Sequence, residues 1–398
     1  MLQLDAVQTL ALAGVALFLG YGLCRWIPVL GRYNLPPPVV GGLIFAIAVW
    51  IAHTRDTTLF VLDTSLQTPL MIAFFTTIGM NASLRLLRIS GTQVMIFLGL
   101  ASGFAVFQNL LGMAVAVGFD LHPLFGVLAG STTLTGGPAT GLAFAPLFEE
   151  AGVPGAESIA VASAMAGIML GGIVGGPAIT VLIRRFNLSP SREQARPAAP
   201  DIETGGPVQT EAIREFNALK AIVTLLIAMW VGAWVSGWIS ATGITLPAYV
   251  GAMLVGAAIR NLDDRTGWVG LSVPTTDLIG NVCLALFLAV ALMNLRLWEL
   301  AGLALPLVLN LVLQVGAVVA FCIVVYRVMG RDYDAAIMGG GFIGFMLGTT
   351  ANAMAVMRAL VERYGTAPRA FLVAPLVGAF FIDFTNALII TGFINFWS

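Results

Sequence analysis

Charged residues are scarce in this sequence. They make up 10% of its 398 residues, whereas 59% are hydrophobic. A soluble domain ordinarily carries about 25% charged residues. This deficit argues against a soluble protein and predicts an integral membrane protein. The formal net charge of −1 gives no reason to expect nucleic acid as a partner.

Cysteine and histidine are rare as well, with three and two residues. The cysteines lie singly in apolar segments and form no disulfide or metal-binding pattern. An intramembrane hydrolase would need a pair of aspartates, a Ser–His pair or a metal motif, and the sequence offers none of these. We therefore expect neither an enzyme nor a cofactor.

Apolar runs recur along the chain at lengths suited to a bilayer, which a helix crosses with about 20 mostly apolar residues. The expected crossings are residues 6–24, 36–52, 68–84, 92–118, 158–183, 218–240, 246–261, 277–294, 300–326 and 371–393. They predict an all-α membrane protein of ten transmembrane helices in two halves, 1–185 and 218–398. A Pro-rich polar stretch at 186–217 predicts a flexible linker between the halves.

Two Gly-rich apolar stretches, 129–144 and 339–354, lie at matching places in the two halves and outside these crossings. Both are too apolar for loops in water, and each Gly costs a helix roughly 1 kcal/mol relative to Ala. Broken backbone is tolerated in a membrane only where protein buries it or where it lines a cavity. We predict a re-entrant hairpin near 123–148 and another near 335–364.

The two halves share weak sequence similarity at an offset of 211 to 213 residues. LPPPVVGGL from Leu35 recurs as LPAYVGAML from Leu246, and Met80-Asn81 recurs as Met293-Asn294. Because each half has five crossings, the second half must insert upside down. The pattern predicts inverted repeats with a binding site at their interface.

Basic residues give the orientation. With the N-terminus outside, all of the 19 Lys and Arg residues except Arg55 and Arg296 fall on the cytoplasmic side. Both termini are then expected outside and the central linker in the cytoplasm.

Asp383 lies near the middle of the last crossing. Charges at that depth are costly and usually mark an ion or proton path, although a structural Asp that is protonated or hydrogen-bonded is the alternative. Carboxylate and amide oxygens suit a hard cation such as sodium. We predict sodium contacts from Asp383 and Asn386, and from the repeat mates Asn81 and Asn294. The alternative for buried amides, including Gln108 and Asn109, is that they bridge helices.

The tips of the Gly-rich stretches carry hydroxyls and glycines. A helix that starts at each tip would direct free N–H groups and its positive dipole end at an anionic group. The alternative is close helix packing through small residues. The predicted substrate contacts are Ser131, Thr132, Thr133, Thr135, Gly136, Gly137, Thr140, Gly141, Gly348, Thr349, Thr350 and Asn352.

Several motifs occur in a familiar order. They include LPPPVVGGL, PLMIAFFTTIGMNASL, LAGSTTLTGGPATG, GRDYDAAIMGGGFIGFMLGTTANAMAVM and FLVAPLVGAFFIDFTNALII. In this respect the chain resembles the bacterial sodium/glutamate symporter family over nearly all of its length outside the linker. The resemblance implies sodium-coupled uptake of L-glutamate across the bacterial inner membrane by alternating access. It also implies a homodimer in contact with membrane lipid, with a scaffold and a moving transport domain.

Three residues depart from the family's pattern. Pro138 and Phe342 stand where family members have histidine, and Ala351 stands where they have proline. A different amino acid or a dicarboxylate therefore remains an alternative substrate. Coupling to protons through Asp383 is an alternative to sodium coupling, and an ion channel is an alternative to a transporter.

Overall fold

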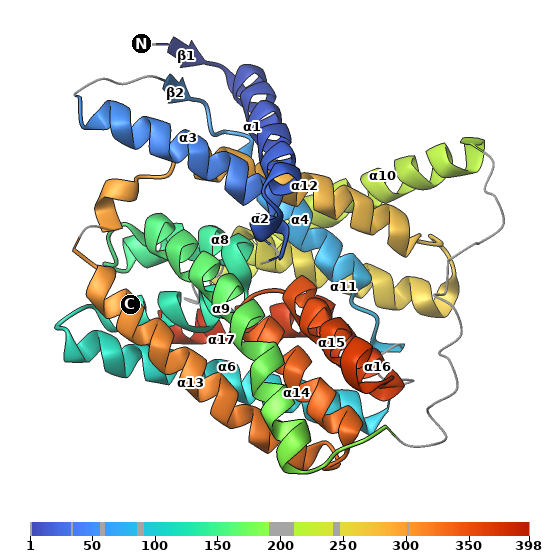
Figure 1. Cartoon of the computed structure of the whole chain (residues 1–398). Helices are drawn as coiled ribbons and strands as arrows, with labels where there is room; N and C mark the ends of the chain where they lie inside the picture. The colour runs from blue at the N-terminus through green and yellow to red at the C-terminus, as the bar shows by residue number, and fades with distance from the viewer. Residues whose placement is uncertain are drawn as a thin grey trace.

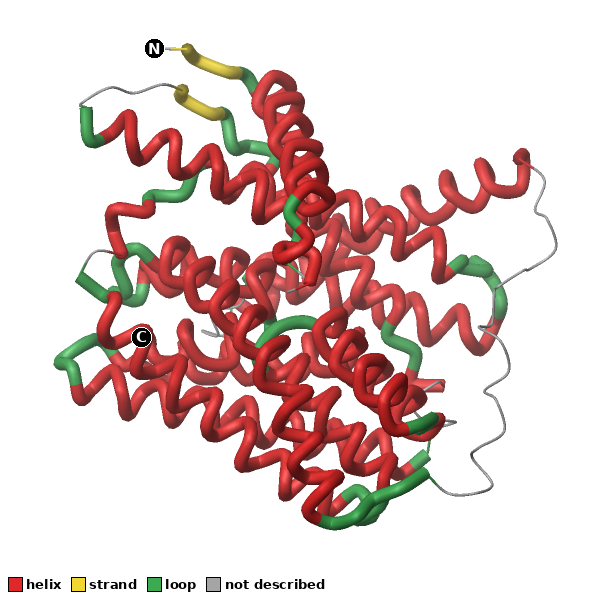
Figure 2. Tube along the Cα trace, in the orientation of Figure 1, coloured by secondary structure: helices red, strands yellow, loops and turns green. Residues whose placement is uncertain are grey.

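The computed structural model describes residues 2–32, 35–55, 60–85, 91–190, 211–241, 247–300 and 302–397, and these are almost entirely helical (Figure 2). The predicted all-α class is confirmed, with one small exception. Strands β1 (Leu2–Leu4) and β2 (Phe60–Leu62) pair in parallel, with Leu2 opposite Phe60.

Six helices form what we call the first body, in the upper part of Figure 1. They are α1 (Ala6–Trp26), α3 (Pro37–His53), α4 (Gln67–Asn81), α10 (Glu211–Ser240), α11 (Ala248–Thr266) and α12 (Val273–Met293), and the short α2 (Pro28–Arg32) follows α1. Within this body α4 packs against α11 and α12, and α1 packs against α3. Glycine permits the close approach of α4 to α11, because a Cβ on Gly79 would overlap the Met253 carbonyl.

The remaining helices form the second body, in the lower part of Figure 1. They are α6 (Thr92–Gly118), α7 (Pro123–Val127), α8 (Gly137–Glu150), α9 (Ala156–Arg185), α13 (Ala304–Val328), α14 (Tyr333–Met346), α15 (Thr350–Tyr364), α16 (Pro368–Leu376) and α17 (Ile382–Trp397). Two π-helical turns, η1 (Leu128–Thr132) and η3 (Val377–Phe381), interrupt it, and a 3-10 turn η2 (Leu297–Leu300) precedes α13. The core of this body includes the rings of Phe104, Phe321 and Phe342, which contact one another in tilted, edge-on and stacked arrangements.

Each body takes helices from both halves of the sequence. The first body combines α1, α3 and α4 with α10, α11 and α12, and the second body combines α6 to α9 with α13 to α17. The halves 1–185 and 218–398 are therefore interleaved in space and do not form two separate globular units.

Within the described residues, six helices are long and apolar enough to cross a membrane: α1, α6, α9, α12, α13 and residues 215–240 of α10. They support the expected membrane protein. The predicted crossings 36–52, 68–84 and 246–261 coincide with the shorter α3 and with α4 and α11. The last one, 371–393, falls on α16, η3 and α17, so a π-helical turn interrupts it. The count of ten crossings remains a prediction.

The predicted linker 186–217 is wrong at its C-terminal end, because α10 already begins at Glu211. The sequence there, EAIREFNALK, is rich in good helix formers, which extend the helix beyond its apolar part. Residues 191–210 of the linker lie outside the described part of the chain.

Candidate substrate and ion site

The first Gly-rich stretch lies in a segment of broken helix, Pro123 to Glu150, which we call the first broken segment. Inside η1, Gly130 has a non-helical backbone with φ −102° and ψ −127°. At the start of α8, Gly137 has φ +69°, a left-handed conformation that Gly adopts without steric cost. The glycines therefore interrupt the helix where the sequence predicts an interruption.

Side-chain amides from three other helices hold this irregular backbone. Asn109 Oδ1 on α6 accepts from the Ser131 N–H at 2.9 Å, and Asn310 on α13 donates to the Ala129 carbonyl at 2.7 Å. Asn386 on α17 donates to the Ser131 carbonyl at 2.9 Å. Buried backbone groups that lose their helical partners need replacements, and these amides provide them. Asn109 thus links α6 to η1, which agrees with the alternative that the buried amides bridge helices.

Gln108 joins the two Gly-rich segments. Its Oε1 accepts from the Thr135 hydroxyl at 2.7 Å, and its Nε2 donates to the Met346 carbonyl at 3.0 Å. The Gln108 carbonyl in turn accepts from Gln314 Nε2 at 2.7 Å. All of these groups are buried, so the network fixes one segment against the other.

The second Gly-rich stretch lies in Tyr333 to Tyr364, the second broken segment, in which α14 ends at Met346 and α15 begins at Thr350. The Thr349 hydroxyl caps α15 by accepting from the Asn352 N–H at 3.4 Å. Asn352 Nδ2 donates to the Ile168 carbonyl on α9 at 2.8 Å. The tip is therefore held by its own cap and by α9.

The tips of the two segments lie next to each other. A Cβ added to Gly137 would lie 3.6 Å from the Gly348 carbonyl oxygen and 3.7 Å from the Thr349 methyl group. A cavity of about 690 Å³ opens between these tips and the first body. The first turns of α8 and α15 both line it, so their free N–H groups and positive dipole ends lie at its wall.

Two carboxylates line the same cavity, Asp383 from α17 and Asp277 from α12. None of the described lining residues is Lys, Arg or His. Asp383 is half-buried and follows directly after the π-helical turn η3, a type of interruption that is frequent at functional sites. The cavity therefore offers backbone N–H groups to an anion and carboxylates to a cation.

The predicted site residues fall into three groups. Eight of them line the cavity: Asn81, Thr135, Gly136, Gly137, Gly348, Thr349, Thr350 and Asp383. Seven are buried without lining it: Ser131, Thr132, Thr133, Thr140, Gly141, Asn352 and Asn386. Asn294 is exposed at the C-terminal end of α12 and lies outside the cavity, so a sodium contact from Asn294 stays a prediction.

Asp277 is the residue that the sequence interpretation missed. Its Oδ1 accepts from Asn81 Nδ2 at 2.6 Å, across the contact between α4 and α12. Asp277 is the first residue of the expected crossing 277–294. A charged residue is common at the end of a membrane helix, so its position did not suggest a binding site. Asn281, one turn later on the same face, was the available signal.

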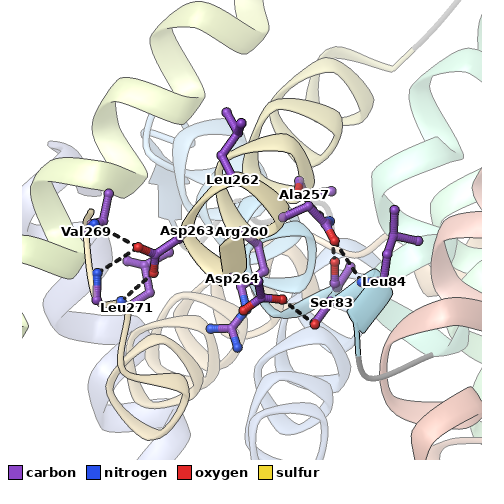
Figure 3. Close-up of polar contacts among 12 residues, drawn as sticks. Ser83, Leu84, Ala257, Arg260, Leu262, Asp263, Asp264, Val269 and Leu271 are labelled. Atoms are coloured by element: carbon purple, nitrogen blue, oxygen red, sulfur yellow. Dashed lines mark hydrogen bonds and ion pairs between the residues drawn. The ribbon is translucent and has the colours of Figure 1, made fainter. Parts of the chain in front are cut away.

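The end of α4, which carries Asn81, is fastened to α11 (Figure 3). Asn261 accepts from the Leu84 N–H at 2.8 Å and donates to the Ala82 carbonyl at 3.0 Å. The Ser83 hydroxyl donates to the Asp264 carboxylate, which also pairs with Arg260 at 3.1 Å. We call this set of contacts the α4–α11 clasp. It fixes the backbone next to the cavity residue Asn81.

Asp263 ties the next loop to α11 (Figure 3). Its carboxylate accepts from the N–H groups of Val269, Gly270 and Leu271 at 2.7 to 2.8 Å. Burial raises the pKa of Asp263, but these three donors outweigh it and hold the pKa below its ordinary value.

Comparison with known proteins agrees with this geometry. The family model described as "Sodium/glutamate symporter" matches residues 2–366. A sodium/glutamate symporter of Haemophilus influenzae is 39% identical over 390 residues, which cover 96% of this chain and 95% of the relative. The sodium/glutamate symporter of Escherichia coli is 40% identical over 395 residues, covering 98% and 97%. The chain belongs to the sodium/glutamate symporter family.

Family membership confirms the resemblance inferred from the motifs. The relatives are named as symporters and not as enzymes, in line with the absence of hydrolase motifs. The structure also separates the three departures within the symporter family. Pro138 and Ala351 line the cavity, whereas Phe342 is buried in the aromatic core of the second body. Of the three, Pro138 and Ala351 are therefore in contact with the cavity, and Phe342 is not.

Proposed function

We propose that this protein is a secondary active transporter of the bacterial inner membrane. It takes up L-glutamate, or a closely related anionic amino acid, together with sodium by alternating access. The observation that carries the proposal is the cavity, in which two helix N-termini meet two carboxylates without a basic side chain among the described lining residues. Membership of the symporter family over nearly the whole chain supports it.

The substrate carboxylates bind at the two tips. There the first turns of α8 and α15 supply N–H groups, and Gly136, Gly137 and Gly348 allow the ligand to approach the backbone closely. Thr135, Thr349 and Thr350 line the same cavity. Thr133, Thr140 and Gly141 are buried behind the tip and shape the first broken segment.

Sodium binds at Asp383 and beside the first broken segment. The Oγ of Ser131, the Oγ1 of Thr132 and the Oδ1 of Asn386 are buried and have no partner among the described residues. A buried polar atom without a partner costs about 1–3 kcal/mol, and a hard cation with oxygen ligands would offset that cost. The amide of Asn386 already links this group to the Ser131 carbonyl.

Coupling follows from charge. An anionic substrate is repelled by the carboxylates of the cavity until sodium has neutralised them, so the substrate site is complete only after sodium binds. Each sodium ion that enters a negative-inside cell gains about 2.3 kcal/mol per 100 mV. This energy drives accumulation of the substrate.

In the membrane, the two broken segments are re-entrant parts of two inverted five-helix repeats, with ten crossings in all. Both termini lie outside. The cavity is lined by Pro36 at the start of α3, Asn81 at the end of α4 and Asp277 near the start of α12. Arg25 lies near the end of α1, which precedes α3, and Arg85 follows α4. Under the positive-inside rule these ends are cytoplasmic, so the cavity faces inward. The second body moves against the first, and the protein works as a homodimer in contact with lipid.

The test is uptake of radiolabelled glutamate by the purified protein in proteoliposomes. An inward sodium gradient at constant pH is expected to drive accumulation, whereas a potassium gradient or a proton gradient without sodium is not. Competition by aspartate, glutarate and neutral amino acids ranks the substrates. Uptake driven by protons alone would replace sodium by proton coupling, and single-channel currents in a planar bilayer would favour a channel.

A further inference from the structure

We propose that Asp277 and Asn81 form a second cation site, on the first-body wall of the cavity. Its ligand is a monovalent cationic group, either a sodium ion or the α-ammonium group of the amino acid substrate. This inference rests on the proposed function and deepens it, because it adds a cation-binding residue from α12 to the sodium groups of the second body.

The geometry of the pair is that of a built site. Asn81 is 5% exposed, and its Nδ2 holds one oxygen of the Asp277 carboxylate at 2.6 Å. The Oδ1 atom of the same amide is buried and has no partner among the described residues. An amide oxygen beside a carboxylate, with Asn281 lining the cavity one turn along α12, is an oxygen ligand set suited to a hard cation.

Two features hold this pair in place. A Cβ on Gly280 would overlap the Thr77 hydroxyl, so α4 and α12 touch within one turn of Asp277. The α4–α11 clasp fixes the residues that follow Asn81. Because both helices are anchored, the ligand atoms do not need to be ordered when a cation arrives.

Charge balance requires a second cationic partner. A bound glutamate adds two carboxylates and one ammonium group to the carboxylates of Asp277 and Asp383, and the described lining residues include no Lys, Arg or His. The helix N-termini stabilise the substrate carboxylates, and a sodium ion at Asp383 neutralises only that group. A partly buried carboxylate without a counter-charge is costly. The Asn81 amide supplies one hydrogen bond to Asp277 but no charge.

The experiment compares the full-length wild type with Asp277→Asn, Asp277→Glu and the matched control Glu362→Gln, all reconstituted in liposomes. Glu362 is an exposed carboxylate on α15 that does not line the cavity. Two quantities are measured for each protein. The first is the sodium concentration that half-activates glutamate binding, with its Hill coefficient. The second is the ratio of the glutarate and glutamate concentrations that displace bound glutamate, because glutarate lacks the ammonium group.

A sodium ligand and an ammonium ligand give different results. If sodium occupies the site, Asp277→Asn raises the half-activating sodium concentration by about tenfold or more, lowers the Hill coefficient and leaves the glutarate-to-glutamate ratio unchanged. If the substrate ammonium occupies it, the ratio falls by about tenfold or more and sodium activation stays as in the wild type. A change in either quantity, with Glu362→Gln behaving as wild type, supports the site.

Asp277→Asn values within about twofold of wild type in both measurements would overturn the proposal. If size-exclusion chromatography shows that Asp277→Asn does not fold, Asp277→Glu decides. The longer side chain is expected to change the relative activation by lithium and sodium, or else the glutarate-to-glutamate ratio. No change in either would again overturn the site. The proposed function fails separately, namely if the wild type itself shows no sodium-driven glutamate uptake.

Discussion

The two bodies build the cavity wall in different ways. The second body presents broken backbone at its two tips, and buried amides such as Gln108, Asn109 and Asn310 replace the lost helical hydrogen bonds. The first body presents two continuous helices, α4 and α12, whose side chains Asn81 and Asp277 reach the cavity. In the proposed function, anion recognition therefore falls to main-chain groups of the second body, and the first body contributes side chains alone. Substitutions in the two bodies should therefore impair transport in different ways.

The largest effect is expected for Asp383→Asn, which removes the second body's charge from the cavity. We expect sodium-driven glutamate uptake to fall by about 100-fold or more, equivalent to about 2.7 kcal/mol. Initial uptake rates in proteoliposomes test this, with Glu362→Gln as a control that removes an exposed charge. Wild-type transport by Asp383→Asn would remove Asp383 from the mechanism.

Next in size is Gln108→Leu, which breaks the connection between the two broken segments. The Thr135 hydroxyl and the Met346 carbonyl both lose a buried partner. The Thr135 hydroxyl keeps Met346 Sδ as a second partner at 3.3 Å. At about 1–3 kcal/mol for the orphaned carbonyl, the free energy of unfolding should fall by about 1–3 kcal/mol. Thermal unfolding of the detergent-solubilised protein measures this. Gln93→Leu, in the first turn of the same helix and outside the network, serves as control, and equal midpoints for the two variants would contradict the role of Gln108.

Gly137→Ala tests the main-chain site directly. A side chain at φ +69° is strained by about 1–2 kcal/mol, although the space beside Gly137 is sufficient. We expect the glutamate concentration for half-maximal uptake to rise by about tenfold. Gly152→Ala is the matched control, since Gly152 has φ +94° and does not line the cavity. It should lose comparable stability but keep its affinity, and loss of affinity in both variants would argue for a general effect of strain.

A smaller effect is expected in the first body. Asp264→Asn leaves Arg260 without its ion pair in the α4–α11 clasp, where both side chains are largely buried. We expect a loss of about 1 kcal/mol in stability, measured by thermal unfolding. Arg265→Gln, the exposed neighbour, should have almost no effect. An Asp264→Asn midpoint as high as that of Arg265→Gln would show that the clasp is not stabilising.

The smallest effect concerns pH and Asp263. Because its pKa in the folded protein is held below the unfolded value, its carboxylate stabilises the fold above the unfolded pKa of about 3.9. That contribution is lost as the pH falls through the folded pKa. Between about pH 5 and pH 3, the thermal midpoint of wild type should therefore fall more steeply than that of Asp263→Asn. Parallel curves would contradict the assignment.

The second body's half of the site was predictable from the sequence. The predicted interruptions are present at Gly130 and Gly137 and around Gly348, although the three glycines 339–341 lie within the continuous α14. Asp383 is conspicuous in an apolar run because of its charge. The contact between the tips agrees with this, with Gly137 beside Gly348. The six long apolar helices were likewise predictable from hydrophobic length. Their ends were less predictable, as the early start of α10 shows.

The first body's half was not predictable in the same way. Asp277 and Asn81 are separated by 196 residues and meet only because α4 and α12 pack together. Asn294, the repeat mate of Asn81, was predicted as a sodium contact as well, but of the two only Asn81 lines the cavity. Ser131 and Asn386 were expected as ligands. Their burial behind the tip depends on the hydrogen bonds that α6, α13 and α17 make to the first broken segment.

The interleaving of the two halves also has a consequence for biosynthesis. Helix α4 leaves the ribosome early, yet its packing partners α11 and α12 are encoded after the whole of α6 to α9. The face of α4 that carries Gly79 must therefore remain in contact with lipid, or with an insertion factor, until translation is well advanced. A nascent chain stalled before α11 should be much more sensitive to membrane proteases than one released complete.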